Sequence, residues 1–338
     1  MTRWGAAAAA LGLAATLAPI DGAGATPAPG RTYEVVDLGS LPGARSSQAN
    51  AINDDSVVVG WSDIGDALSH AFLWRDGHMT DLGSAVGPTG ASRANDISDN
   101  GIVVGGSQTA DGGFHPVMWR DGRIVDLGTL GGSFGEATGV NDDGVIVGYS
   151  ETASGEFHAF RWRQGRMTDL GTVSGQTYSS ATAVDASGRA VGSSGSAVVW
   201  RRTVPTLLPL VAGADSAEAL DTNDRGSTVV GYSVMPGGPS VNRAVMWRHG
   251  VAIDLRLERG TSQALGVNNR SQVVGWRQAE VDTAGQPFLW EDGRVTNLPV
   301  LTGGRGGSAT DINDRGVITG NSPDPDNPDS LGQAVIWR

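Results

Sequence analysis

The stretch ATGVNDDGVIVGYSETASGEFHAFRWRQGRMTDLG, from Ala137 to Gly171, is the clearest copy of a repeat that runs along the chain. It holds four short runs with the consensus A-x-x-(I/V)-N, (V/I)-V-G, x-A-F-x-W and (M/I/V)-x-D-L-G. Short runs rich in β-branched and aromatic residues predict strands rather than helices. Four strands per repeat is the content of one blade of a β-propeller.

Seven copies of the repeat follow Tyr33, and they are numbered here from one to seven. The tryptophan that ends the third run recurs at intervals of 38 to 47 residues, at Trp74, Trp119, Trp162, Trp200, Trp247, Trp290 and Trp337. A mean period of about 44 residues is in the range of propeller blades. The glycine of the V-V-G run recurs in parallel, at Gly60, Gly105, Gly148, Gly192, Gly231, Gly275 and Gly320.

Asn/Asp-x-Gly segments join the first run to the second, and short turns such as RDG and RQG join the third to the fourth. Segments of this kind supply the positive φ angles that tight hairpins need. We therefore expect the four strands of each repeat to be antiparallel neighbours. The two longer connections of each repeat must then emerge together on the opposite rim.

The two ends of the repeat region complement each other. It opens with YEVVDLG (Tyr33 to Gly39), a fourth run without its repeat, and it stops at Trp337-Arg338, a third run without its successor. We expect Glu34 to Leu38 to lie alongside Val335 and Ile336. The prediction is an all-β, seven-bladed β-propeller with four antiparallel strands per blade, whose N-terminal strand closes the last blade. The alternative is an open β-solenoid, which fits less well because its parallel rungs are not joined by hairpins.

The N-terminus resembles a secretory signal. Arg3 precedes an apolar stretch from about Gly5 to Ala18, and Ala23-Gly24-Ala25 has the small-x-small pattern of a cleavage site. We expect residues 1–25 to be a signal peptide, 26–32 a linker and 33–338 the repeat domain, and the protein to be secreted. The alternative is a membrane anchor, but the apolar stretch is shorter than the ~20 residues of a bilayer span.

Composition narrows the function classes. The chain has 36 acidic and 24 basic residues, the basic ones all Arg, for a net charge of −12. A chain this acidic, without a basic run, argues against nucleic-acid binding. The absence of Cys excludes disulfides, thiolate metal sites and Cys nucleophiles.

The candidate ligand-binding residues follow the V-V-G glycine at the start of a variable connection. Aromatic side chains stand there in four repeats, as Trp61, Tyr149, Tyr232 and Trp276. Rigid aromatic faces with a polar tip stack on sugars or anchor a protein partner. The alternative is that they cover the ends of neighbouring sheets.

Metal and catalytic signals are weaker. The tail segment DPDNPD makes Asp324, Asp326 and Asp329 the calcium candidates, although no EF-hand pattern accompanies them. His70, His115 and His158 occupy equivalent positions in different repeats and are expected to pack in strands rather than ligate a metal. The Asp of D-L-G and the Asn of the first turn occur in most repeats, so we expect them to cap backbone N–H groups.

The HAFLW (His70 to Trp74) and HAFRW (His158 to Trp162) runs, each followed by a turn and MTDLG, resemble the HAF-type probable extracellular repeat family. The resemblance covers Tyr33 to Arg338. It implies a secreted bacterial protein with propeller-like repeats, and it brings no reaction, cofactor or catalytic residue. The remaining repeats read HPVMW, SAVVW, RAVMW, QPFLW and QAVIW, so the repeat does not require His.

No catalytic motif of the common hydrolase, metalloprotease or nucleotide-binding kinds is present. The sequence favours a secreted, monomeric, non-enzymatic module without a cofactor, which presents its variable loops to a carbohydrate, a cell-wall polymer or a protein. The alternative is an extracellular polysaccharide hydrolase or lyase with its site at the central mouth. The sequence leaves the ligand unidentified, and the fold alone does not decide between the two.

Overall fold

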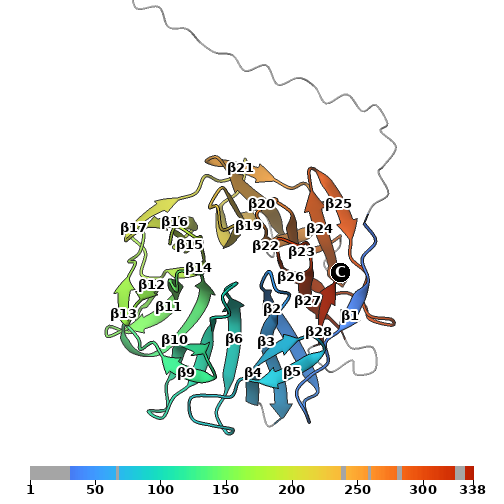
Figure 1. Ribbon diagram of the computed structural model, residues 1–338. Helices are drawn as coiled ribbons and strands as arrows, with labels where there is room; N and C mark the ends of the chain where they lie inside the picture. The colour runs from blue at the N-terminus through green and yellow to red at the C-terminus, as the bar shows by residue number, and fades with distance from the viewer. Residues whose placement is uncertain (1–30, 66–67, 237–240, 258–259, 280–283, 324–331) are drawn as a thin grey trace, which may run out of the picture. The chain divides into compact units, whose positions relative to one another are not determined.

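The computed structural model describes residues 31–65, 68–236, 241–257, 260–279, 284–323 and 332–338. The chain divides into two parts, Met1–Thr32 and Tyr33–Arg338, and the second is described here by itself. All of its secondary structure in the described residues is β-strand, β1 to β28 (Figure 1). The described residues accordingly contain no helix that could cross a membrane.

The strands form antiparallel groups of four that follow the repeats. The groups of repeats one to three are β2 (Ser46–Ile52), β3 (Val58–Gly65), β4 (Leu68–Arg75) and β5 (His78–Asp81); β6 (Ser92–Ile97), β7 (Val103–Gln108), β8 (Phe114–Arg120) and β9 (Arg123–Asp126); and β10 (Gly131–Val140), β11 (Ile146–Thr152), β12 (Phe157–Arg163) and β13 (Arg166–Asp169). A single parallel bridge between Phe134 and Phe114 joins the second group to the third.

The groups of repeats four to six are β14 (Ser180–Val184), β15 (Ala190–Ser193), β16 (Ala197–Arg201) and β17 (Val204–Leu207); β18 (Ser216–Thr222), β19 (Thr228–Met235), β20 (Val241–Arg248) and β21 (Val251–Asp254); and β22 (Thr261–Val267), β23 (Val273–Gln278), β24 (Gln286–Glu291) and β25 (Arg294–Asn297). Repeat seven supplies β26 (Ser308–Ile312), β27 (Ile318–Ser322) and β28 (Gln333–Trp337).

The fourth strand beside repeat seven is β1 (Val35–Asp37), from the other end of the domain. It pairs antiparallel with β28, with Val35 opposite Trp337, Val36 opposite Ile336 and Asp37 opposite Val335. Backbone hydrogen bonds extend the pairing on both sides, from Glu34 to Arg338 and from Leu38 to Ala334. The N-terminal strand therefore lies where the incomplete ends of the sequence predicted it.

The turns have the backbone geometry that their residues predict. In repeat three the first hairpin turns at Gly144, with φ of 68°, and the second turns at Gln164 and Gly165, with φ of 51° and 82°. These positive φ angles are easy for Gly and tolerated by a few other residues. Both connections are consequently short, and the strands on either side of them pair antiparallel.

The glycine of the V-V-G run marks a close approach between the first two strands of each sheet. A Cβ placed on Gly148 would lie 2.0 Å from the backbone oxygen of Glu136. The same contact recurs at the equivalent glycine in the other repeats, where the distance is 1.9 to 2.1 Å. The repeat keeps glycine here because any side chain would force the two strands apart.

Apolar layers fill the spaces between neighbouring sheets. One layer combines Val145 and Val147 of repeat three with Val198 and Trp200 of repeat four. Another joins Val58 and Phe72 of repeat one with Ala334 and Ile336 of repeat seven. The indole N–H of Trp337 also donates to the Pro299 carbonyl of repeat six, at 2.6 Å. Each sheet thus buries its two faces against its neighbours.

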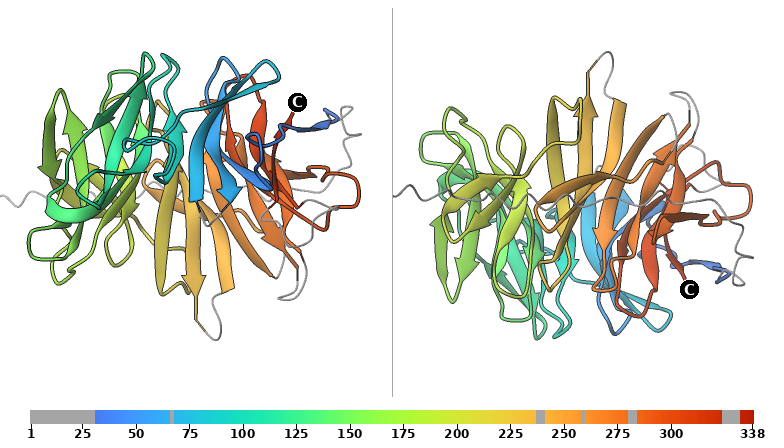
Figure 2. Two further views of the ribbon diagram at one scale, coloured as in Figure 1. Left: turned by 90° about the horizontal axis from the view of Figure 1, so that it is seen from below. Right: turned by 90° about the horizontal axis from the view of Figure 1, so that it is seen from above.

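The sheets stand around a common centre, with the first strand of each repeat innermost (Figure 1). Seen from the side, the strands run between two opposite rims (Figure 2). We call the rim with the tight turns the hairpin rim and the opposite one the wide-loop rim. Four-stranded antiparallel sheets around a centre are the arrangement of a β-propeller.

Candidate functional site

The four aromatic candidates occupy one register position, at the point where the second strand approaches the wide-loop rim. Each is opposite a polar residue of the innermost strand and is partly buried: Trp61 opposite Gln48, Tyr149 opposite Glu136, Tyr232 opposite Glu218 and Trp276 opposite Gln263. The position therefore combines an aromatic face with a hydrogen-bonding group in each of these repeats.

Two of the four belong to one connected group. The Arg93 guanidinium of repeat two lies over the Trp61 ring of repeat one, 5.5 Å from its centroid. Arg93 also interacts electrostatically with Glu136 of repeat three, and the Tyr149 hydroxyl donates to the same carboxylate. Trp61, Arg93, Glu136 and Tyr149 form what we call the Trp61–Tyr149 surface.

Further aromatic rings extend this surface. Phe134 stacks on Phe114 at 5.6 Å and on Tyr149 at 6.3 Å, and Phe157 packs against both Phe134 and Tyr149. Repeat two has room for Phe114 because Gly106 replaces the aromatic residue there: a Cβ on Gly106 would lie 2.2 Å from the Phe114 ring. Phe134 remains 36% exposed, so the cluster reaches solvent.

Burial shapes the electrostatics of the surface. Desolvation raises the pKa of Glu136 above its ordinary value, against the lowering effect of a hydrogen bond from Asn95 and of the Arg93 charge. Desolvation, with the Glu136 charge in second place, also raises the pKa of Tyr149. The Tyr149 hydroxyl therefore stays protonated and acts as a hydrogen-bond donor at neutral pH.

Tyr232 and Trp276 lie in repeats five and six. Tyr232 bonds to Glu218 of its own sheet, and burial followed by this bond raises its pKa. Trp276 packs near Gly285, where an added Cβ would lie 3.4 Å from the indole ring. The structure links Trp61 to Tyr149 through Arg93 and Glu136, whereas the contacts of Tyr232 and Trp276 described here are within their own repeats.

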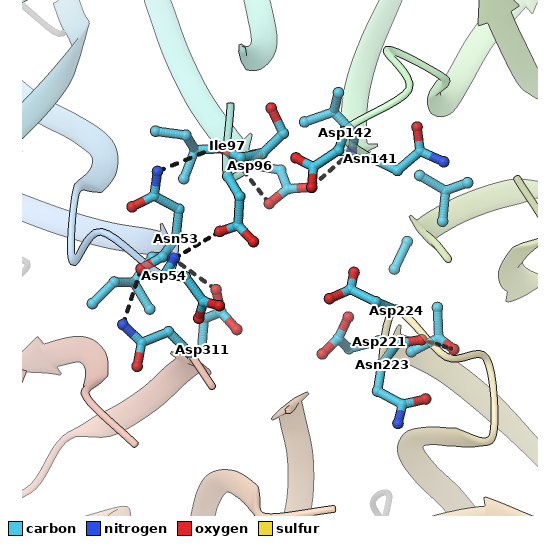
Figure 3. A pocket seen from close by; sticks show the side chains of 18 of the residues that line it. Asn53, Asp54, Asp96, Ile97, Asn141, Asp142, Asp221, Asn223, Asp224 and Asp311 are labelled. Carbon is cyan, nitrogen blue, oxygen red and sulfur yellow. Dashed lines mark hydrogen bonds between the residues drawn. The ribbon is translucent and has the colours of Figure 1, made fainter. Parts of the chain in front are cut away.

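The central channel holds three aspartates that the sequence analysis missed. Asp96, Asp221 and Asp311 come from the innermost strands of repeats two, five and seven and line one pocket of about 130 Å³ (Figure 3). The other repeats have Ala or Gly at this position, namely Ala51, Gly139, Ala183 and Gly266. An alignment of the repeats could have identified these aspartates, because a carboxylate stands there in three repeats and Ala or Gly in the other four.

Each of these carboxylates accepts a hydrogen bond from the next repeat. The donors are the backbone N–H groups of Val140 to Asp96 at 2.7 Å, of Val267 to Asp221 at 2.8 Å and of Ile52 to Asp311 at 2.9 Å. Each carboxylate stands just after the bulge at which the innermost strand shifts its register against the second strand. They therefore tie neighbouring sheets together near the axis.

Burial makes these aspartates weak acids. Desolvation raises the pKa of Asp96 to about 7 and that of Asp311 to about 6, and it raises the pKa of Asp221 well above the ordinary range. Like charges across the channel add to the effect: Asp311 raises the pKa of both Asp96 and Asp221. The channel consequently changes its charge near neutral pH.

The sequence analysis named three calcium candidates and three histidines that it expected to pack in strands. Asp324, Asp326 and Asp329 lie outside the described residues. His70, His115 and His158 each place Nδ1 2.8 to 2.9 Å from the D-L-G aspartate of their own repeat, at Asp81, Asp126 and Asp169. Within the described part of the chain, no three His, Cys, Asp or Glu side chains are grouped as metal ligands.

The recurrent Asp and Asn have the architectural roles that their repetition predicted. The D-L-G aspartate accepts the N–H two residues ahead, as in Gly171 to Asp169 at 2.7 Å. The turn asparagine accepts an N–H of its own hairpin and donates to the next repeat, as Asn141 does with the Val145 N–H at 3.0 Å and the Asp185 carbonyl at 2.9 Å.

No family model matches the chain, and no curated protein matches it. Among solved structures it is similar to a puromycin hydrolase (TM-score 0.51, 14% identity), covering 90% of this chain and 54% of that one. It is also similar to XC5397 from Xanthomonas campestris, described as a gluconolactonase (0.43, 12%, 90% and 89%), and to TolB from Acinetobacter baumannii (0.42, 15%, 75% and 54%).

The chain spans about half the length of the puromycin hydrolase and TolB chains. Identities this low carry information on the fold alone. The four-stranded antiparallel sheets and the likeness to the puromycin hydrolase together describe an all-β protein with a β-propeller fold.

Proposed function

We propose that this protein is a secreted, non-enzymatic binding module that presents the wide-loop rim of a closed, seven-bladed propeller to a carbohydrate ligand. A cell-wall polymer is the most extended form of such a ligand, and a protein is the other class of partner. Cleavage after Ala25 and membership of the HAF-type extracellular repeats are parts of the same proposal.

The closed ring is supported by contacts between repeats seven and one. β1 pairs with β28, Asn313 donates to the Asn53 carbonyl at 2.9 Å, and Thr310 donates to the Ala49 carbonyl at 3.0 Å. The same Thr contact joins repeats three and four, where Thr138 donates to the Ala181 carbonyl at 2.8 Å. The joint between the last and first repeats therefore uses the contacts of an ordinary joint.

The observation that carries the binding proposal is the Trp61–Tyr149 surface. Aromatic faces stack on the apolar faces of sugar rings, while an adjacent Arg and carboxylate match the hydroxyl groups at the ring edge. The Tyr–Glu pair recurs as Tyr232 and Glu218, but Arg93 stands where the other repeats have Gln, Glu or Ser. The combination of Arg with an aromatic residue and a carboxylate therefore occurs once among the repeats. A single, chemically mixed surface is what a specific binding module needs, whereas a purely structural role would recur in each repeat.

The alternative, a polysaccharide hydrolase or lyase, has one observation in its favour: three aspartates with raised pKa values, at a position where the other four repeats have Ala or Gly, line the channel. Two features weigh against it. The carboxylates already accept backbone N–H groups of the next repeat. The two pockets that these aspartates line, of about 130 and 140 Å³, are also each smaller than the roughly 300–1,000 Å³ of ordinary ligand sites.

The test is a glycan and cell-wall-polymer array probed with residues 26–338, followed by affinity measurements on the ligand found. We expect Trp61→Ala and Tyr149→Ala each to weaken binding by roughly tenfold or more, because each removes a stacking face. Trp276→Ala is the matched control, because it removes the same kind of side chain from the same register position in repeat six. Equal losses in all three variants would contradict the assignment of the surface.

The enzyme alternative is checked with the same preparation. Wild type and Asp96→Asn are incubated with a polysaccharide panel, and new reducing ends or unsaturated products are measured. Cleavage by the wild type that disappears in Asp96→Asn would replace the binding proposal with the enzyme. Binding on the array without cleavage supports the module.

A further inference from the structure

The arginines of this acidic chain are not evenly spread. Five of them line one pocket of about 460 Å³ on the hairpin rim between repeats three, four and five: Arg161, Arg189, Arg201, Arg202 and Arg225. Asp185 is the one carboxylate in the described lining. The pocket therefore carries a strong positive charge in a chain whose net charge is −12.

Three of these arginines depart from the repeat. Arg161 stands where the other repeats have Leu, Met, Val or Ile, just before the tryptophan. Arg189 stands where repeats one, two, three and seven have Val or Ile after the first turn. Arg202 stands in the second turn, where other repeats have Asp, Gln or His. Arg189 pairs with Asp185, which replaces the turn Asn in repeat four, whereas Arg161 and Arg202 have no carboxylate partner of this kind among the described residues.

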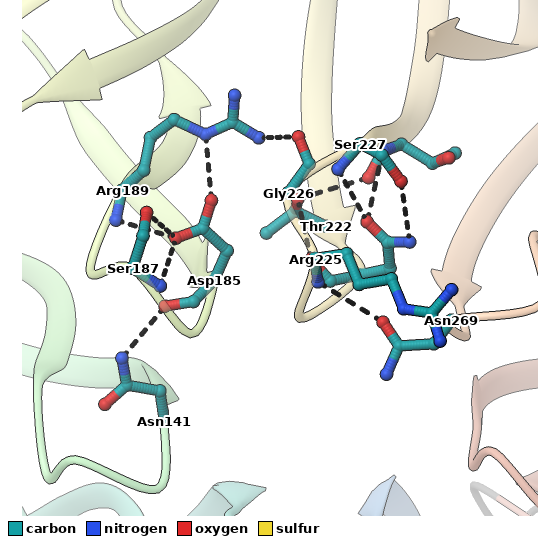
Figure 4. A network of polar contacts seen from close by, with 11 residues as sticks. Asn141, Asp185, Ser187, Arg189, Thr222, Arg225, Gly226, Ser227 and Asn269 are labelled. Atoms are coloured by element: carbon teal, nitrogen blue, oxygen red, sulfur yellow. Dashed lines mark hydrogen bonds and ion pairs between the residues drawn. The ribbon is translucent and has the colours of Figure 1, made fainter.

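The surrounding structure holds the guanidinium group of Arg189 in position. The Arg189 Nε binds the buried carboxylate of Asp185 at 2.9 Å, and its Nη2 donates to the Gly226 carbonyl (Figure 4). Asp185 is fixed in turn by the Ser187 hydroxyl at 2.6 Å. Arg189 thus has a single orientation, with its head group between the turns of repeats four and five.

Arg161 enters the pocket wall from repeat three. A Cβ on Gly188 would lie 2.8 Å from its Nη2, so the glycine of the neighbouring turn leaves room for the guanidinium. The Nε of Arg161 is buried and has no hydrogen-bond partner among the described residues. A buried donor without an acceptor costs roughly 1–3 kcal/mol, so Arg161 stands in the pocket wall at a cost that its hydrogen bonds to the described residues do not offset.

The arrangement is that of an anion site. Guanidinium groups bind oxyanions through paired, charge-assisted hydrogen bonds, and clustered like charges repel one another until an anion offsets them. We propose that this pocket binds a tetrahedral oxyanion, phosphate or sulfate, either free or as an ester on a sugar-sized group. It lies on the opposite rim from the Trp61–Tyr149 surface and does not depend on it.

The volume distinguishes the two forms of the ligand. The pocket has a volume of about 460 Å³, which is within the usual range of small-molecule sites. This volume is larger than one tetrahedral ion fills. The exposed Arg201, Arg202 and Arg225 would contact the oxyanion from the solvent side, with Arg161 and Arg189 behind it. We expect an ester to bind more tightly than the free ion.

The test is isothermal titration calorimetry of the full chain with glucose 6-phosphate, glucose 6-sulfate, inorganic phosphate and glucuronate at low salt. The variant is the double change Arg161→Met with Arg202→Gln, which installs the residues of repeats two and three (Met118 and Gln164) and so keeps the fold. The control is Arg75→Gln with Arg120→Gln, which removes the same charge from exposed positions elsewhere on the hairpin rim.

We expect binding of both esters, weakened by roughly tenfold or more in the pocket variant and by less than about twofold in the control. Tighter binding of the esters than of inorganic phosphate supports the ester form, and equal binding assigns the site to the free ion. Absence of binding of phosphate and sulfate in every form, preferential binding of glucuronate, or equal losses in the two double variants would overturn the proposal.

Discussion

The backbone N–H of Ile52 donates to the Asp311 carboxylate at 2.9 Å, joining the innermost strand of repeat one to that of repeat seven. The two residues are 259 positions apart in the sequence. Asp96 and Asp221 make the same contact to the repeats that follow them. An acid whose pKa is near neutral thus takes part in the contact between the two ends of the repeat array.

The stability of the protein should depend on these aspartates. Their pKa values are raised in the folded state, so folding favours the protonated form. The stabilisation is complete below the unfolded pKa, near 4, and is lost as the pH rises through about 6 for Asp311 and about 7 for Asp96. We expect the free energy of unfolding to fall over this window.

The check is urea denaturation of wild type and Asp96→Asn between about pH 5 and pH 8. Residue 96 cannot ionise in the variant, so the loss of stability over the window should be smaller than in the wild type by about 2 kcal/mol. Parallel pH profiles for the two proteins would show that Asp96 does not titrate in this range.

Removing β1 should weaken the sheet of repeat seven. A chain that starts at residue 40 lacks the strand, and it exposes the edge of β28 and the layer that contains Val35 and Tyr33. We expect a loss of about 2–4 kcal/mol relative to a chain that starts at residue 31. Thermal denaturation measures it, and a peptide of residues 31–40 added in trans should restore part of the loss. Identical melting of the two chains would contradict the role of β1.

The V-V-G glycines should tolerate no side chain. Gly148→Ala places a Cβ 2.0 Å from the Glu136 oxygen, so the first two strands must separate, and we expect a loss of about 3 kcal/mol or more. Gly285→Ala is the control, because its nearest contact is 3.3 Å and it should cost less than about 1 kcal/mol. Chemical denaturation compares the two; similar losses would mean that the close approach is not the reason for the glycine.

His70 should be replaceable by the residue that other repeats use. Its Nδ1 binds Asp81 at 2.8 Å, while Gln286 stands at the equivalent position in repeat six and donates to the Leu298 carbonyl at 2.9 Å. We expect His70→Gln to cost less than about 1 kcal/mol and His70→Ala to cost more, because the alanine leaves Asp81 without its partner. Thermal melting with and without EDTA distinguishes this hydrogen-bonding role from metal ligation. If His70 bound a metal, both the His70→Gln change and EDTA would lower the melting temperature.

Much of the fold could be predicted from the repeat itself. The β-branched runs indicated the strands, and the Asn/Asp-x-Gly turns indicated the hairpins, because both depend on local sequence. The unmatched runs at the two ends indicated the β1–β28 pairing, because one end has a fourth run and the other lacks one. The D-L-G aspartates and the turn asparagines were also assigned correctly, since their contacts lie within one or two hairpins.

The channel aspartates and the arginine pocket could not be predicted in this way. Asp96, Asp221 and Asp311 each follow a bulge in the innermost strand. A bulge interrupts the alternation of side chains between the two faces of a strand, so the direction of these carboxylates could not be read from the sequence. Arg161 and Arg202 are 41 positions apart, in different repeats, and only the packing of neighbouring sheets brings them to one pocket.

The pairing of Val36 with Ile336 also sets the order of folding. β1 is made before its partner β28, which comes from repeat seven. Repeats one to six can assemble while the chain grows, but β1 cannot pair in a sheet until β28 has been made. A chain cut short before Gln333 would therefore leave the edges of both β1 and β27 open to pairing with other chains.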